Sequence, residues 1–111
     1  MALTSTILGT TNTTVYTSTI SGSQSGNAIT CMIICNYGVA QANVTVYAVP
    51  NSSGSVGSAS NSNIIISALP IPPGETVSLD QEKLVLSSND TIVAFSSLAS
   101  TLSMTLSTLP V

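Results

Sequence analysis

Charge is the scarcest property of this 111-residue chain, which has four acidic residues, one basic residue and no histidine. All the charged side chains fall between positions 75 and 90: they are Glu75, Asp80, Glu82, Lys83 and Asp90. A soluble domain normally carries about a quarter charged residues. Because Ser and Thr make up about a third of this sequence, its surface must present hydroxyl groups or be covered by other protein chains.

The shortage of basic residues argues against nucleic-acid binding. Lys83 is the only cationic side chain, there is no arginine, and the formal net charge is −3. Each phosphate contact normally needs a Lys, an Arg or a backbone N–H group. We therefore expect no nucleic-acid partner, and the net charge is too small to steer a partner over long range.

Long hydrophobic runs are also missing. The longest uninterrupted apolar run is Cys31–Cys35, whereas a membrane-spanning helix needs about 20 such residues. The first residues, Met1–Thr6, contain no basic segment followed by an apolar one, so they do not resemble a secretory signal. We expect no membrane partner.

Cys31 and Cys35 are the only cysteines. On a β-strand, residues four positions apart lie on one face but about 13 Å from each other, at a rise of about 3.3 Å per residue. A disulfide requires Cα atoms within about 7 Å of each other, so the two cysteines cannot bond if they lie on one strand. The sequence predicts two buried free thiols that act as small apolar residues, in a protein made in a reducing cytoplasm.

The absence of histidine excludes the common serine and cysteine triads and most zinc sites. A Ser–Lys pair could be built around Lys83, but no serine is distinguished as a nucleophile, and the spacing of Asp80 and Glu82 is typical of a solvated turn. The sequence predicts a protein that is not an enzyme, with no catalytic residues and no cofactor.

A calcium site is the metal site most compatible with this composition. Asp80, Glu82, Asn89 and Asp90 could supply oxygen ligands if their two turns meet. Calcium needs six or more oxygens, and no EF-hand or similarly spaced loop is present. We therefore predict no metal-binding residues.

Short segments rich in Val, Ile, Thr and Tyr alternate with Gly, Pro, Asn and Ser, and no segment has apolar residues at helical spacing. The predicted strands are Thr14–Ile20, Ala28–Asn36, Ala42–Val49, Asn63–Leu69, Glu75–Leu79, Lys83–Leu86, Thr91–Ser97 and Leu102–Leu109. We expect an all-β fold: a single antiparallel β-sandwich of about eight short strands, of jelly-roll or Ig-like type.

The segments between the strands complete the predicted organisation. Pro73-Gly74 fits the centre of a type II turn, and residues 87–90 fit a second tight turn. Asn51–Ser62 is a long loop of Ser, Gly and Asn with little to pack. No strand is predicted in residues 1–12, which we interpret as an N-terminal arm attached to a β-sandwich domain of residues 13–111.

The scarcity of charge also bears on assembly. A hydroxyl-rich surface lacks the charge repulsion that keeps monomers apart, and strand edges without Lys or Pro are open to pairing with another chain. We predict a homo-oligomer whose subunits also dock onto a larger assembly.

The order of strands and turns resembles a family of small virion proteins of tailed bacteriophages, abundant in cyanophages and other environmental phages. The similarity runs from Thr13 to the C-terminus, about nine-tenths of the chain. The matching segments, in order, are Thr14–Thr17, Ala28–Thr30, Ile34–Asn36, Val44–Pro50, Ile64–Ile66, Ile71–Thr76, Leu79–Leu86 and Asn89–Ala94, followed by a terminal strand. Relatives often carry Gly in the turn where this chain has Ser88-Asn89, which affects the turn rather than the role.

The resemblance implies a compact β-sandwich that forms a homotrimer on the virion. It further implies a capsid decoration, or cement, protein that sits at local three-fold positions and bridges subunits of the major capsid protein. Such a protein would be made in the host cytoplasm, would act on the capsid surface, and would resist the pressure of packaged DNA by adding buried interface.

A tail, baseplate or fibre module that contacts the host surface is the alternative role. It would present loops such as Asn51–Ser62 outward, with aromatic or carboxylate contacts to glycans, whereas a cement protein would use its N-terminal arm and one face. The low aromatic content favours cement. The position of the charges between Glu75 and Asp90 predicts that this end of the molecule faces solvent.

Overall fold

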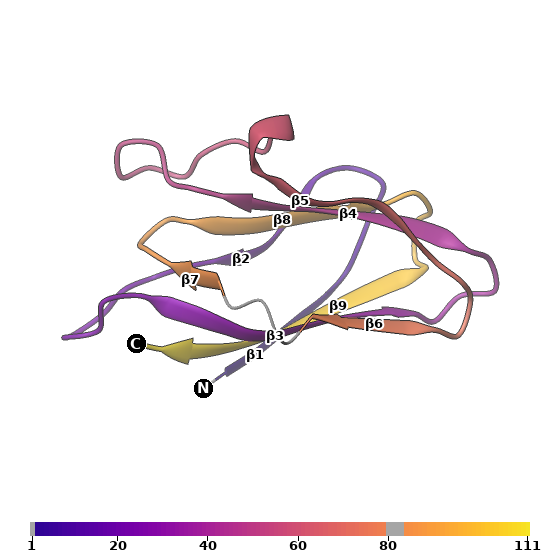
Figure 1. Cartoon of the computed structure of the whole chain (residues 1–111), viewed down its shortest axis with the longest axis horizontal. Coiled ribbons are helices and arrows are strands. Elements are labelled where there is room, and N and C mark those ends of the chain that lie inside the picture. Colours follow the sequence, from indigo (N-terminus) through magenta and orange to yellow (C-terminus); the bar gives the residue numbers. More distant parts are fainter. Residues whose placement is uncertain (1, 80–83) are drawn as a thin grey trace.

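The computed structural model describes residues 2–79 and 84–111, which form two stacked β-sheets (Figure 1). The strands are β1 (Ala2–Ile7), β2 (Thr13–Thr17), β3 (Asn27–Asn36), β4 (Ala42–Val49), β5 (Ile64–Ile71), β6 (Thr76–Leu79), β7 (Leu84–Leu86), β8 (Thr91–Ser96) and β9 (Leu102–Pro110). A single turn of 3₁₀ helix, η1 (Asn61–Asn63), precedes β5.

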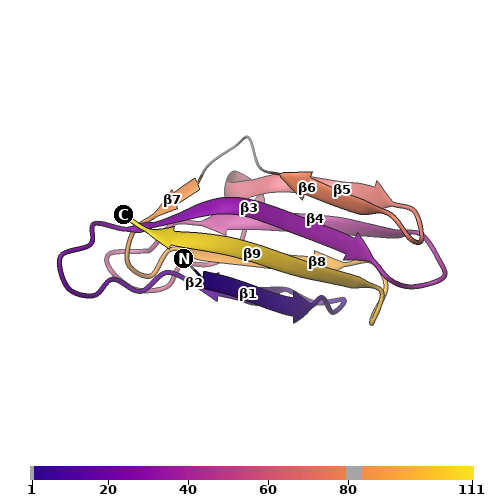
Figure 2. The same ribbon diagram turned by 90° about the horizontal axis from the view of Figure 1, so that it is seen from below.

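Every strand pair is antiparallel. The first sheet has the order β1-β9-β3-β6, and β7 pairs with the other end of β3 (Figure 2). The second sheet has the order β2-β8-β4-β5. The all-β sandwich predicted from the sequence is confirmed.

The pairing is nested, and this distinguishes the two sandwich types. β1 pairs with β9, β2 with β8, β3 with β6 and β7, and β4 with β5. In an Ig-like sandwich the first strand would pair with its neighbour in sequence. When β6 and β7 are counted as two pieces of one strand, the nested order is that of an eight-stranded jelly roll.

Alternation along the strands builds the core. In β9, the buried Leu102, Met104 and Leu106 alternate with the half-buried hydroxyl residues Ser103 and Thr105. Successive strand residues point to opposite faces of a sheet, so the two inner faces meet in one apolar layer. Its fully buried members include Leu8, Ile34, Val44, Val46, Ile71 and Ile92. Each side chain of this size contributes about 1.5–3 kcal/mol when fully buried.

The prediction of an N-terminal arm is wrong for residues 2–7. These residues form β1 and pair in register with β9. The next residue, Leu8, is fully buried, and its N–H donates a hydrogen bond to the Leu102 carbonyl (2.9 Å). Thr and Ile favour strands, but the apolar Leu3 and Ile7 of β1 point outward. The segment therefore lacks the core-facing apolar pattern that reveals a strand in a sequence.

Candidate functional site: the uncharged face of the first sheet

The outward side of the first sheet, which we call the outer face, is a chemically uniform surface of the described structure. Directly opposite residues of antiparallel strands share a face, so the registers define its members. They are Leu3, Ser5, Ile7, Ala28, Cys31, Ile33, Cys35, Thr76, Ser78, Val85, Ser103, Thr105, Ser107 and Leu109. None of them carries a charge.

Large apolar side chains on the outer face are open to solvent, most of all at its borders. Leu3 is 75% exposed on β1, and Val85 is 65% exposed on β7. Hydroxyl and thiol side chains fill much of the rest. Covering a charged group in a protein interface requires its desolvation, and the described residues of the outer face include no such group. It can therefore be buried against another protein at low cost in solvation energy.

Cys31 and Cys35 lie on the outer face, on either side of Ile33. Both are free and half-buried, so the prediction of free thiols is confirmed, and the prediction that they are buried is wrong. The reason is a register shift between Ile29 and Cys31 in the β3–β9 pairing. A bulge of this kind reverses which residues face the core, and the inward positions pass to Met32 and Ile34.

The outward side of the second sheet has a different character. Val49 and Thr91 are almost fully buried there, and a side chain at Gly57 would lie only 3.3 Å from Val49 Cγ1, so the loop after β4 covers this region. The rings of Tyr47 and Phe95 stack with their centres 6.4 Å apart. Much of this side is thus already covered by the chain itself.

The charged residues do not mark one end of the molecule, contrary to prediction. Glu75 precedes β6, which pairs with the last residues of β3, while Asp90 follows β7, which pairs with the first residues of β3. These two carboxylates therefore lie at opposite ends of the sandwich. Asp80, Glu82 and Lys83 lie outside the described residues.

Asp90 fastens the turn before β8 to the loop after β4. Its Oδ1 accepts hydrogen bonds from the Asn51 backbone N–H (2.8 Å) and Nδ2 (2.9 Å), and its Oδ2 accepts one from the Ser87 N–H (2.8 Å). Asn89 adds a second link, because its Nδ2 donates to the Gly54 carbonyl (2.6 Å). The start of the Asn51–Ser62 loop is thus held in place, and the Asp90 carboxylate is committed to the fold.

Two opposing effects act on the pKa of Asp90. Partial burial opposes the charged form and would raise the pKa, but the hydrogen bonds from Asn51 and Ser87 favour the charged form and hold the pKa below its ordinary value. A carboxyl group with a lowered pKa in the folded state adds stability above its unfolded pKa of about 4. That stability is lost as the pH falls through the folded-state value.

The substitution Asp90→Asn is therefore expected to lower the free energy of unfolding by about 1–2 kcal/mol at pH 7, because hydrogen bonds to a charged acceptor are lost or weakened. The difference from the wild type should shrink as the pH falls through the lowered folded-state pKa of Asp90, because protonation then makes the wild-type carboxyl neutral as well. Urea unfolding at pH 7 and at a series of acidic pH values measures this, with Glu75→Gln as the control at an exposed carboxylate. Equal stabilities at pH 7 would contradict the role of Asp90.

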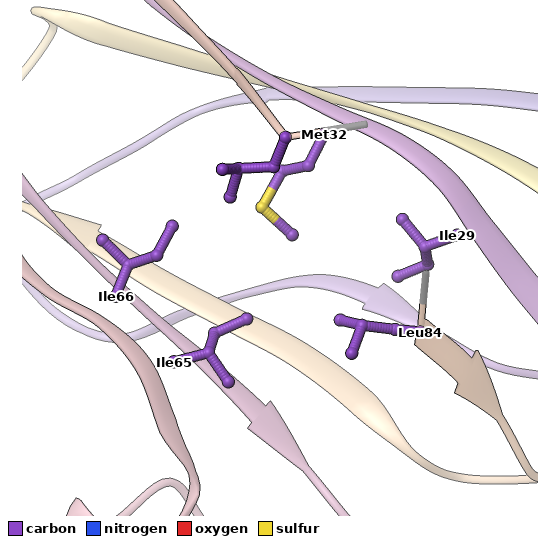
Figure 3. A pocket seen from close by; sticks show the side chains of 6 residues that line it. Ile29, Met32, Ile65, Ile66 and Leu84 are labelled. Atoms are coloured by element: carbon purple, nitrogen blue, oxygen red, sulfur yellow. The ribbon is translucent and has the colours of Figure 1, made fainter. Parts of the chain in front are cut away.

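An apolar cavity of about 430 Å³ lies between the two sheets (Figure 3). Its lining consists of Ile29, Met32, Ile65, Ile66, Leu79 and Leu84. The labelled side chains in Figure 3 converge on the space from both sheets, and the lining residues offer only hydrocarbon and thioether groups. Among the described residues, this lining favours apolar packing and includes no side chain that could orient a polar substrate.

The described residues contain no group of three His, Cys, Asp or Glu side chains placed to hold a metal ion. Of the four residues considered as calcium ligands, Asn89 and Asp90 are described, but Asp80 and Glu82 are not. Over residues 2–79 and 84–111, no helix is long and apolar enough to cross a membrane. No protein-family model matches the chain, and no curated protein matches it either.

Proposed function

We propose that this chain is a structural virion protein of a tailed bacteriophage, acting as a trimeric capsid decoration protein that bridges subunits of the major capsid protein. The observation that carries the proposal is the uncharged outer face, which offers apolar and hydroxyl groups across a whole sheet. The resemblance of the strand and turn order to small phage virion proteins is the reason for proposing a phage particle as its location. The fold alone would not support that location, since jelly rolls serve in many roles.

The proposed mechanism is mechanical and involves no catalytic step. A standard protein–protein interface buries about 1,600 Å², and a trimer that touches several capsid subunits adds several such interfaces. Within residues 2–79 and 84–111, the outer face presents no charge that must be desolvated when it is covered. Each contact would therefore tie neighbouring capsid subunits together and oppose their separation under internal pressure.

A tail, baseplate or fibre module with a host-binding loop is the alternative, and the loop geometry argues against it. The Asn51–Ser62 loop contains no aromatic residue. The nearby carboxylate of Asp90 already accepts hydrogen bonds from Asn51 and Ser87 on both of its oxygens. Neither of the groups that recognise glycans is thus presented there, which favours the decoration role.

Copy number distinguishes the two locations. A decoration protein should be present at many tens to hundreds of copies per particle, because local three-fold positions cover the whole shell. A tail component should be present at a few copies up to a few dozen. Quantitative gel densitometry of purified virions against the major capsid protein makes this measurement. A copy number in the lower range would contradict the decoration role and indicate a tail component.

A further inference from the structure

The strand edges of the sandwich are not equally protected against pairing. Natural β-proteins block their edges with bulges, prolines, charges or short strands. β2 has a register shift, β6 and β7 are only four and three residues long, and β5 has register shifts, Pro70 and a left-handed residue, Ala68 (φ 48°). β1 has none of these features: its six residues pair with β9 without a shift and include no proline and no charge.

The free backbone groups of β1 belong to Leu3, Ser5 and Ile7. The Leu8 N–H donates to the Leu102 carbonyl, and these two residues continue the β1–β9 register. Hydrogen-bonded pairs alternate along an antiparallel ladder, so residues 2, 4 and 6 direct their backbone groups toward β9. The N–H and C=O groups of residues 3, 5 and 7 then point away from β9, where no strand of the described structure pairs with them.

The sequence of β1 is nearly palindromic about Ser5. It reads Leu3-Thr4-Ser5-Thr6-Ile7, so each side of Ser5 carries a Thr and then a large aliphatic residue. A two-fold axis through Ser5 would place Leu3 opposite the partner subunit's Ile7, and Thr4 opposite the partner subunit's Thr6. Apolar side chains would meet apolar ones on the outer face, and hydroxyl groups would meet hydroxyl groups on the other side.

We propose that β1 is a self-pairing edge, through which two copies of this chain join their first sheets antiparallel about a two-fold axis at Ser5. The three free N–H groups and three free C=O groups of each β1 would all be satisfied by those of the other copy. Leu3 and Ile7, 75% and 59% exposed in the single subunit, would pack against each other across the join. Nothing in this contact requires a charge to be desolvated.

This contact is isologous, because the same strand is used on both copies. It joins copies in pairs and cannot by itself close a trimer, so it is additional to the three-fold contact proposed above and does not rest on a virion location. A protein with the β1 contact alone would form dimers, and one that also has a three-fold contact would form hexamers when the two-fold and three-fold axes cross at right angles. In either case, loss of the β1 contact halves the mass of the particle in solution.

The substitution Ser5→Pro tests this pairing. The Ser5 N–H points away from β9, and proline is tolerated on an edge strand whose N–H faces solvent, so the subunit should remain folded while the join is blocked. Light scattering on the full chain should show half the wild-type mass for Ser5→Pro at equal concentration. Val39→Lys is the control, since Val39 is 98% exposed and lies outside both β1 and the outer face; it should keep the wild-type mass.

Three outcomes would overturn the proposal: a wild-type protein that stays monomeric, an unchanged mass for Ser5→Pro, or an equal loss of mass for the control Val39→Lys. If Ser5→Pro fails to fold, amide hydrogen exchange on the wild type decides. The amides of Leu3, Ser5 and Ile7 should be protected at high concentration and should exchange freely on dilution. The amides of Thr4, Thr6 and Leu8 should stay protected throughout. Free exchange of the first three at all concentrations would contradict the pairing.

Discussion

Deletion of residues 2–8 is expected to lower the free energy of unfolding by at least about 3 kcal/mol, because it removes a strand and a core residue together. Burial of Leu8 alone accounts for about 1.5–3 kcal/mol, and each lost backbone hydrogen bond of the ladder adds about 0.5–1.5 kcal/mol. Leu102, Met104 and Leu106 would also lose the cover that β1 gives to β9. Urea unfolding of the full and shortened chains measures the difference.

Leu8→Ala is the matched control for this deletion. It leaves β1 in place and should destabilise the protein by about 2–5 kcal/mol, as other large-to-small core substitutions do. If residues 2–8 were a detached arm, the deletion would leave the denaturation midpoint unchanged. That result would contradict the assignment of β1 to the first sheet.

Asn36→Ala is expected to destabilise the protein by about 3–5 kcal/mol, because Asn36 is fully buried and joins three parts of the chain. Its Nδ2 donates to the carbonyls of Ala40 (2.9 Å) and Ile71 (2.8 Å), and its Oδ1 accepts from the Gly38 N–H (2.9 Å). Each buried group left without a partner costs about 1–3 kcal/mol. A loss of this size is a large part of the 5–15 kcal/mol that holds a typical domain together.

Asn36→Asp sharpens this test because it keeps the shape of the side chain and changes only its hydrogen bonding. An ionised carboxylate at this position would face the carbonyls of Ala40 and Ile71 with no hydrogen to donate. The folded state would then favour the neutral acid, so the pKa of the introduced carboxyl would lie above its unfolded value. The stability of Asn36→Asp should therefore rise as the pH is lowered from 7 to 4.

Urea unfolding at the two pH values measures this effect, with Asn61→Asp in the exposed 3₁₀ turn as the control. The control should show no comparable recovery at pH 4. If Asn36→Asp were as stable as the wild type at pH 7, the hydrogen bonds of Asn36 would not be holding these segments together.

Local patterns were sufficient to predict most of the strands and both turns; at residues 87–90 the Asp90 N–H donates to the Ser87 carbonyl (3.1 Å). The predicted strand at Ala42–Val49 coincides with β4, and the strand at Ala28–Asn36 starts one residue after β3. The type II turn at Pro73-Gly74 is confirmed, because Gly74 has φ 79° and the Glu75 N–H donates to the Pro72 carbonyl (3.2 Å). These features depend on neighbouring residues alone, which is why the sequence reveals them.

The features that the sequence did not reveal depend on partners far along the chain. β1 became recognisable only from its pairing with β9, since its large side chains face outward. The choice between jelly roll and Ig-like sandwich required the same long-range pairings. The composition of the outer face depends on the bulge after Ile29, because a shift of one residue exchanges the core and solvent positions of everything that follows. For the same reason, the exposure of Cys31 could not be predicted.

The most direct test of the decoration role is a comparison of phage particles with and without this protein. Particles that lack it should release their DNA at a lower temperature, and adding the purified protein should restore the temperature of wild-type particles. Thr105→Lys, which places a charge in the middle of the outer face, should fold normally but restore much less. If particles without the protein were as heat-stable as complete ones, the protein would not act as a capsid cement.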